Sequence, residues 1–270
     1  MSKTIAILVH ERTTREMMRR YFIWQLVACW VRNGLAVRSV HRNTPLKPAD
    51  LLIVHVDLSV VPDAYLDIAR QYPVAINSGV RDIRKRSFSR LLVTPDSDWE
   101  GPVIVKTNLN SAGLPERNLG CSLGEDDPGG VVGPTGYAVY PNRSRVPRHL
   151  LGRRGIVLEK FLPERRNGSN CIRSYNFLGD AEVTFMAYSK HSIIKLENIS
   201  SMEVIETDPG IREIRQKMGF DYGKFDYVVH DGEVILLDAN KTPGHLEITS
   251  PDLQQIVERR AEGVYSFLGP

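Results

Sequence analysis

Polar side chains with the chemistry of a metal site alternate along two neighbouring strand-like segments near residue 230. These side chains are Lys224, Asp226, Asp238 and Asn240. Asp231-Gly232 lies between the two segments and is typical of the turn of a β-hairpin. Carboxylate and amide oxygens are hard ligands of the kind that Mg²⁺ binds. The pattern therefore predicts a hairpin that carries a magnesium site.

The length of the hairpin loop decides whether the two carboxylates meet. With a two-residue loop, Asp226 would lie opposite Leu237, and Asp238 would point to the other face of the sheet. With a three-residue loop that starts at His230, Lys224 faces Asp238, and Asp226 becomes its diagonal neighbour. This register also gives the opposite face an all-apolar set of side chains: Phe225, Tyr227, Ile235 and Leu237. We expect the three-residue loop; exposed carboxylates balanced by Lys224 are the alternative.

Hydrophobic periodicity divides the elements that must position this hairpin into three parts. Residues 1–78 alternate strand and helix patterns, which is typical of a parallel α/β lobe. Residues 79–154 contain a basic helix, a strand and loops rich in Gly, Pro and Asn, which predict a small subdomain with a mobile flap. Residues 155–270 are typical of an α+β subdomain with antiparallel strands. The expected strands cover 5–9, 35–40, 50–56, 73–76, 102–106, 156–161, 172–177, 182–188 and 192–196, and the expected helices cover 14–33, 62–71, 81–90, 209–218 and 251–267.

Composition excludes several classes of protein. With 270 residues, 42% hydrophobic and 25% charged, the chain is unlike a disordered segment or a single small module. Its net charge of +3 is too weak to indicate nucleic-acid binding, and no apolar run approaches the roughly 20 residues of a membrane span. The three cysteines form no CxxC pair, which argues against a disulfide framework or a structural zinc site. We expect a cytoplasmic protein, with a homodimer as one possibility.

Several familiar motifs are missing from the sequence. The segment 219–225 has three residues between its glycines instead of the four of a P-loop, and Phe225 follows its lysine instead of Ser or Thr. The segment 129–133 lacks the GxGxxG spacing of a dinucleotide-binding turn. Neither GxSxG nor HExxH occurs. The hairpin therefore remains the most informative feature.

The hairpin resembles the end of the nucleotide-binding domain of the ATP-grasp superfamily. In that family a basic-x-Asp strand precedes an acidic-x-Asn strand and a Pro-Gly turn, as in Lys224-x-Asp226, Asp238-x-Asn240 and Pro243-Gly244. Other segments follow in the family's order. The segment 82–85 resembles the helix with a first phosphate-binding lysine, and 102–106 resembles the strand with the second. The resemblance covers residues 80 to about 250 and implies a two-subdomain ATP-grasp fold behind an α/β lobe.

The resemblance also implies roles for individual residues. Lys85 and Lys106 would hold the phosphates of ATP, and Ser111 and Gly113 would belong to a glycine-containing flap over 108–113. A hinge whose backbone reads adenine and whose later acid holds ribose would comprise Glu159, Lys160, Phe161, Leu162 and Glu164. Arg173 and Lys224 would stabilise charge on the transferred phosphoryl and acyl oxygens. One or two Mg²⁺ ions, for which Mn²⁺ can substitute, would bind Asp226, Asp238 and Asn240.

The activity that the resemblance implies is that of an ATP- and Mg²⁺-dependent ligase. Such a ligase activates a carboxylate as an acyl phosphate, which an amine or a similar nucleophile then attacks. The alternatives are an ATP-grasp kinase and an inactive nucleotide-binding scaffold. Two departures affect the metal and the phosphoryl group: Asp238 replaces the more usual Glu, and Lys224 replaces the more usual Arg.

Overall fold

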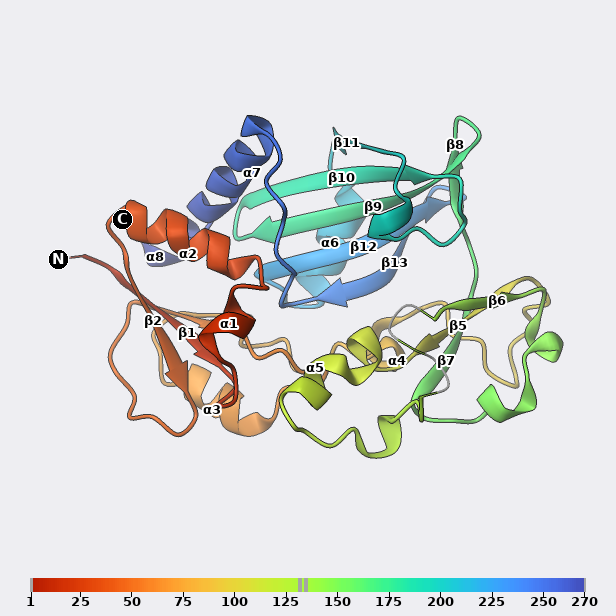
Figure 1. Ribbon diagram of the computed structural model, residues 1–270, viewed down its shortest axis with the longest axis horizontal. Coiled ribbons are helices and arrows are strands. Elements are labelled where there is room, and N and C mark those ends of the chain that lie inside the picture. The colour runs from red at the N-terminus through yellow and green to blue at the C-terminus, as the bar shows by residue number, and fades with distance from the viewer. Residues whose placement is uncertain (1, 131–132, 134–135, 270) are drawn as a thin grey trace.

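The computed structural model describes residues 2–130, 133 and 136–269, which form three parts around three sheets (Figure 1). The first part is a parallel four-stranded sheet with the order β2-β1-β3-β4. It confirms the predicted parallel α/β lobe. The elements of this lobe are β1 (Thr4–Val9), α1 (Arg15–Met18), α2 (Ile23–Arg32), β2 (Ala36–His41), β3 (Leu51–Val54), α3 (Asp63–Ala69) and β4 (Ala75–Ile76).

The helix predicted over 14–33 is interrupted between α1 and α2. In the interruption the backbone bonds to a distant segment, because the N–H of Phe22 donates to the carbonyl of Pro243 at 2.8 Å. The N–H of His245 in turn donates to the carbonyl of Arg20 at 2.7 Å. These bonds fasten the N-terminal lobe to the segment that follows the predicted metal ligands.

The second part is a small antiparallel sheet with the order β6-β5-β7. The basic helix predicted over 81–90 is only the four-residue α4, because the residues before it run along the N-terminal lobe. Asp82 forms a bridge with Val60, and the N–H of Ile83 donates to the carbonyl of Ser59. The elements are α4 (Lys85–Phe88), β5 (Val103–Thr107), η1 (Asn110–Gly113), α5 (Leu114–Asn118), η2 (Gly124–Asp126), β6 (Ala138–Tyr140), η3 (Arg143–Arg145), η4 (Arg148–Leu150) and β7 (Ile156–Lys160).

The third part is a large antiparallel sheet with the order β11-β10-β9-β12-β13, and β8 pairs with β9. The strand predicted over 192–196 is wrong: this segment is a loop, and the edge strand begins only at Ser201. The elements are β8 (Glu164–Arg166), β9 (Ser169–Leu178), β10 (Ala181–Ser189), η5 (Leu196–Asn198), β11 (Ser201–Ile205), α6 (Pro209–Lys217), β12 (Tyr222–His230), β13 (Glu233–Asn240), α7 (Pro251–Glu262) and α8 (Tyr265–Leu268).

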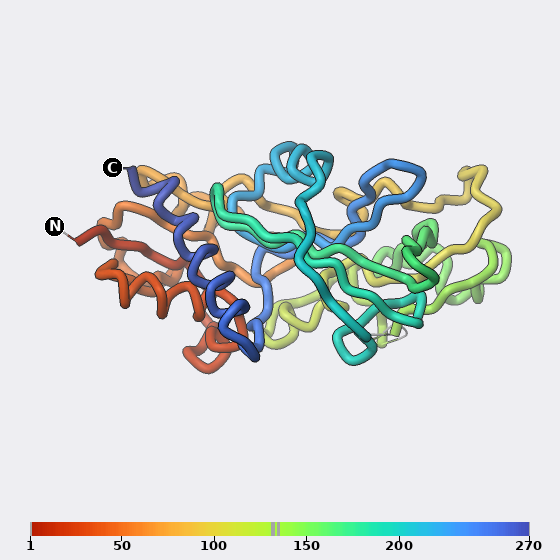
Figure 2. Tube along the Cα trace, turned by 90° about the horizontal axis from the view of Figure 1, so that it is seen from above, coloured from red at the N-terminus to blue at the C-terminus, as the bar shows by residue number. Residues whose placement is uncertain are grey.

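The two C-terminal helices return to the N-terminal lobe. Figures 1 and 2 show α7 beside α2, with both chain ends on the same side of the molecule. The indole of Trp30 on α2 donates to the carbonyl of Ala261 on α7 at 2.8 Å, and both residues belong to one apolar core with Leu178 and Tyr222. The lobe and the large sheet therefore share a core. No helix in the described part of the chain combines the length and the apolarity needed to cross a bilayer.

Candidate active site

The two predicted metal-binding strands pair with a register shift. His230 pairs with Glu233, so the loop has two residues, and the expectation of a three-residue loop is wrong. The register then changes between Asp226 and Tyr227, because β13 contains one extra residue there as a β-bulge. The bulge places Asp226 directly opposite Asp238. The predicted convergence of the two carboxylates is confirmed, although the bulge achieves it and not the loop.

The bulge also changes which apolar residues reach the core. Phe225 and Tyr227 are fully buried, as expected, but their partners from β13 are Leu236 and Ala239. Ile235 was wrong because the two-residue loop places Leu236 opposite Tyr227 and Ile235 opposite Val228. Leu237 was wrong because it is the extra residue of the bulge, after which Ala239 reaches the core. These aromatic and aliphatic side chains hold the hairpin rigidly on one face.

The opposite face of β9, β12 and β13 is polar. Strand register places Lys224 opposite both Asn176 and Asn240, and it places Asp226 opposite both Ser174 and Asp238. Ser174 and Asn176 were not among the predicted site residues. The alternation of polar and aromatic residues over 174–177 was the available signal.

Lys85, Lys106 and Lys224 each have a carboxylate partner. Lys85 is buried, and its ammonium group donates to Asp238. Burial opposes its charged form, but Asp238 prevails and raises the pKa of Lys85 above the ordinary lysine value. Lys224 lies 3.0 Å from Asp226, which likewise raises the pKa of Lys224. Lys106 lies 2.7 Å from the buried carboxylate of Glu159. Lys85 and Lys224 are therefore held as cations.

Four of these charged groups, Lys85, Lys106, Asp226 and Asp238, line a cavity of about 180 Å³ between the small and large sheets. Lys224, Glu159 and Asn240 lie outside this lining. Seven predicted site residues line it: Lys85, Lys106, Lys160, Phe161, Leu162, Asp226 and Asp238. The rest of the lining is mainly apolar, with Ile104 from β5 and Val228 from β12. The sequence analysis missed Tyr137 and Cys171, which also line the cavity. Tyr137 follows a glycine-rich segment whose spacing matches no recognised motif.

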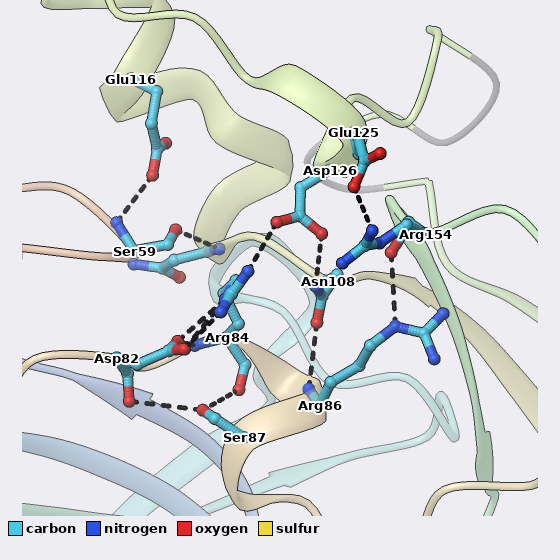
Figure 3. Close-up of polar contacts among 11 residues, drawn as sticks. Ser59, Asp82, Arg84, Arg86, Ser87, Asn108, Glu116, Glu125, Asp126 and Arg154 are labelled. Atoms are coloured by element: carbon cyan, nitrogen blue, oxygen red, sulfur yellow. Dashed lines mark hydrogen bonds and ion pairs between the residues drawn. The ribbon is translucent and has the colours of Figure 1, made fainter.

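A polar network fixes the start of α4 relative to the end of β5 (Figure 3). The side chain of Asn108 accepts from the N–H of Arg86 at 3.0 Å and donates to Asp126 at 2.7 Å. Arg84 joins Asp82 to Asp126. The carbonyl of Asn108 also accepts from the N–H of Lys85. Because Lys106 is on β5 two residues before Asn108, the network sets the spacing of the two cavity lysines.

The predicted flap residues Ser111 and Gly113 lie away from the cavity. Their turn, η1, packs against the N-terminal lobe, where the N–H of Asn110 donates to Ser59 and the N–H of Ser59 donates to Glu116 (Figure 3). Ser111, Ala112 and Gly113 all have positive φ. This conformation strains the backbone of Ser111 and Ala112, and the anchoring bonds offset the strain. The structure therefore does not place this turn over the cavity.

Arg173 and Glu164 also lie outside the cavity lining. Arg173 is on the same face of the sheet as Tyr175 and Tyr227, opposite to the polar face. Its guanidinium binds both oxygens of Glu164, at 2.7 and 3.2 Å. Burial opposes the charged form, but Glu164 raises the pKa of Arg173. The two residues form a buried structural pair. The structure does not bring them to the nucleotide cavity, where the sequence predicted Glu164 at the ribose and Arg173 at the transferred phosphoryl group.

The polar face has a donor set suited to Mg²⁺. Asp226 and Asp238 present carboxylate oxygens from directly opposed positions. The side-chain oxygen of Asn240 already accepts from the N–H of Thr242 at 2.8 Å, which orients this oxygen and leaves it a second lone pair. In the described part of the chain no group of three or more His, Cys, Asp and Glu residues could hold a metal. The protein would therefore supply two carboxylates and one amide oxygen to a divalent ion, and water or phosphate oxygens would complete its coordination.

Comparisons with known proteins bear on the fold. No family model matches the chain, and no curated protein sequence matches it. The structure is similar to D-alanine–D-alanine ligase from Bacillus anthracis, with a TM-score of 0.50 and 12% identity over 97% of each chain. It is also similar to the D-cycloserine synthetase DcsG, with a TM-score of 0.53 and 13% identity over 98% of this chain and 100% of the other. The Bacillus anthracis ligase complexed with ATP matches with a TM-score of 0.50 and 13% identity. At these identities the likeness establishes the fold.

Proposed function

Because this chain has the ATP-grasp fold, we propose that it is an ATP- and Mg²⁺-dependent ligase that activates a carboxylate as an acyl phosphate. One observation carries the proposal: two lysines and two opposed carboxylates line a single cavity between the two antiparallel sheets. Phosphoryl transfer needs this combination of cations and metal ligands around the outer phosphates. Of the solved structures reported above, one is named a D-alanine–D-alanine ligase and one a D-cycloserine synthetase.

The nucleotide contacts follow from the cavity lining. Lys85 and Lys106 would exchange their carboxylate partners for phosphate oxygens when ATP enters. Asp226, Asp238 and Asn240 would hold Mg²⁺, which neutralises the outer phosphates when it is bound. The apolar lining beside Phe161 and Leu162 would cover the base. Ser111, Gly113, Glu164 and Arg173 have no part in this proposal, because they lie away from the cavity.

The reaction would proceed in two displacements on the polar face. A carboxylate oxygen of the substrate attacks the γ-phosphorus of ATP, so that ADP leaves and an acyl phosphate forms. The nitrogen of an amine then attacks the acyl carbon, loses a proton and expels inorganic phosphate. Lys224 lies beside Asp226 on this face, where its charge would stabilise the developing oxyanion.

The test is a screen for ADP release with pairs of small carboxylates and amines, repeated with hydroxylamine. A ligase should release ADP only with its carboxylate, and hydroxylamine should convert the acyl phosphate into a hydroxamate. Stable phosphate on a hydroxyl of the substrate would identify a kinase instead. Calorimetry that shows no binding of Mg-ATP would reject both enzymes, whereas binding without turnover of any substrate would favour the inactive nucleotide-binding scaffold.

A further inference from the structure

The guanidinium of Arg260 on α7 is buried in the core. Arg260 is 3% exposed, and in the described residues its Nε and Nη2 atoms have no partner. These two atoms belong to one edge of the guanidinium, the edge that binds a carboxylate in bidentate fashion. The flat face of the group is occupied, because it stacks 3.9 Å from the ring of Phe22. The edge formed by Nε and Nη2 remains available for an acceptor.

Tyr222, whose hydroxyl interacts electrostatically with Arg260, and His55 beside Tyr222 also have polar atoms without partners among the described residues. The hydroxyl of Tyr222 and both ring nitrogens of His55 have no hydrogen bond within the described part of the chain, and each residue is at most 2% exposed. The rings of Tyr222 and His55 lie 6.3 Å apart. Burial lowers the pKa of His55 to about 3, so its imidazole is neutral at physiological pH. Burial lowers the pKa of Arg260 only to about 10, so the guanidinium stays charged.

No carboxylate of the described residues neutralises this charge. Asp57 is the carboxylate on the neighbouring turn, but its two oxygens already accept from Tyr21 and Thr242. Buried charges are normally paired, and buried donors are normally satisfied by protein, water or a bound ion. The Arg260 edge and the Tyr222 hydroxyl present several N–H and O–H donors and lack an anionic acceptor.

The place of this cluster in the sheet connects it with the polar face. Tyr222, Lys224 and Asp226 alternate along β12, so their side chains point to the same side. At roughly 3.3 Å per residue, Tyr222 at the start of β12 lies about 13 Å along the strand from Asp226. The cluster is therefore at the end of the polar face that meets the N-terminal lobe.

We propose that Arg260, with the hydroxyl of Tyr222, binds a carboxylate group in the core between the N-terminal lobe and α7. The group can come from two sources: a second carboxylate of the enzyme's substrate, or a small free carboxylate. The first source rests on the proposed function, and the second is independent of it. In both cases the planar anion receives two N–H bonds from Arg260 and one O–H bond from Tyr222.

The binding test uses the full chain without nucleotide. We expect 100 mM sodium formate to raise the melting temperature by about 2–4 °C more than sodium chloride at equal ionic strength, because only formate matches the bidentate edge. A crystal structure from formate should show the planar anion on Nε and Nη2. Equal effects of the two salts, or ordered water alone on that edge, would overturn the proposal.

Variants separate binding from packing. Arg260→Met keeps a long apolar stem over Phe22 and should lose the formate-specific shift. Tyr222→Phe keeps the ring and should reduce the shift by about half. Arg259→Met is the matched control, because Arg259 is exposed on the same helix and should keep the full shift. An undiminished formate shift in both Arg260→Met and Tyr222→Phe would contradict the assignment.

A second arm identifies the source of the carboxylate. If the substrate supplies it, the wild type should prefer dicarboxylic over monocarboxylic substrates by at least about tenfold in kcat/KM, and Arg260→Met should lose this preference. Formate binding without any such preference would identify a free carboxylate. Binding of Mg-ATP, measured separately, reports on the nucleotide site. Failure of the proposed ligase function is thereby distinguished from failure of the carboxylate site.

Discussion

The polar face of strand β12 differs in charge between its two ends, at Asp226 in the middle of the strand and at Tyr222 at the start of the strand. At Asp226 the acidic and basic side chains neutralise one another, as in the pairs Lys85–Asp238 and Lys224–Asp226. At Tyr222 no carboxylate of the described residues pairs with the neighbouring Arg260, and Nε and Nη2 of Arg260 and the hydroxyl of Tyr222 have no partner there. Internal pairs can be exchanged for phosphate and a metal ion, whereas an unpaired buried guanidinium is satisfied only from outside. The comparison distinguishes a site that is self-neutralised from one that awaits an anion.

The largest expected effect is at the paired end. Asp226→Asn keeps the size of the side chain but removes a charged metal ligand, so we expect ATP turnover to fall by about 10²–10³-fold. Steady-state ADP release at saturating Mg²⁺ measures this loss. Asp231→Asn is the control, because Asp231 lies at the exposed hairpin turn with 91% of its side chain accessible. Equal turnover in the two variants would remove Asp226 from the site.

The contrast between the two ends also separates what sequence patterns predict from what they do not. Lys224-x-Asp226 and Asp238-x-Asn240 are local patterns with a direct chemical meaning, and the structure brings Asp226 and Asp238 together. The bulge that aligns them depends on packing of Leu236 and Ala239 against Phe225, which alternation alone does not specify. Arg260 is an ordinary basic residue of an amphipathic helix in the sequence. Its isolation follows only from the return of α7 to the N-terminal lobe.

The flap prediction failed for a related reason. Ser111 and Gly113 have the composition of a mobile loop, but composition does not show that Ser59 and Glu116 anchor the segment. Long-range hydrogen bonds of this kind connect positions about 50 residues apart. Conversely, Tyr137 lines the cavity because β6 pairs with β5 across a 30-residue excursion. Tertiary pairing decided both placements.

The next effect concerns acid stability at the unpaired end. The pKa of His55 falls from 6.5 in an exposed histidine to about 3 in the fold. Below pH 6.5 the imidazole of His55 is therefore protonated in the unfolded chain but neutral in the folded chain, and stability is lost as pH falls towards 3. Between pH 6.5 and 5 this amounts to about 2 kcal/mol. Urea unfolding at pH 7 and 5 measures the free energy of unfolding. Between these pH values it should fall in His55→Gln by this amount less than in the wild type.

Histidine substitution elsewhere provides the reference for that measurement. His149 is exposed, so His149→Gln should keep the acid-dependent loss of the wild type. If His55→Gln loses as much stability on acidification as His149→Gln, the imidazole of His55 is not held neutral in the core.

A smaller effect is expected from the second cavity lysine. Lys106→Met alone would leave Glu159 buried and unpaired, which destabilises the fold. The double variant Lys106→Met with Glu159→Gln removes both charges and should retain most of the stability. It should weaken Mg-ATP binding about tenfold, because one charge-assisted phosphate contact is lost. Calorimetry measures the affinity, and Lys217→Met on the far helix α6 is the control. An unchanged affinity in the double variant would exclude Lys106 as a phosphate ligand.

The smallest effect is a change in cysteine reactivity, and it locates the nucleotide directly. Cys171 lines the cavity, and burial raises its pKa to about 11, so it should react slowly with a maleimide. Bound Mg-ATP should slow this reaction about threefold further by filling the cavity. Cys121 is half-buried outside the cavity lining and should react at the same rate with and without nucleotide. Mass spectrometry of the labelled peptides measures both rates in one sample. Protection of Cys121 instead of Cys171 would place the nucleotide at the N-terminal lobe, and the paired end of β12 would lose its proposed ligand.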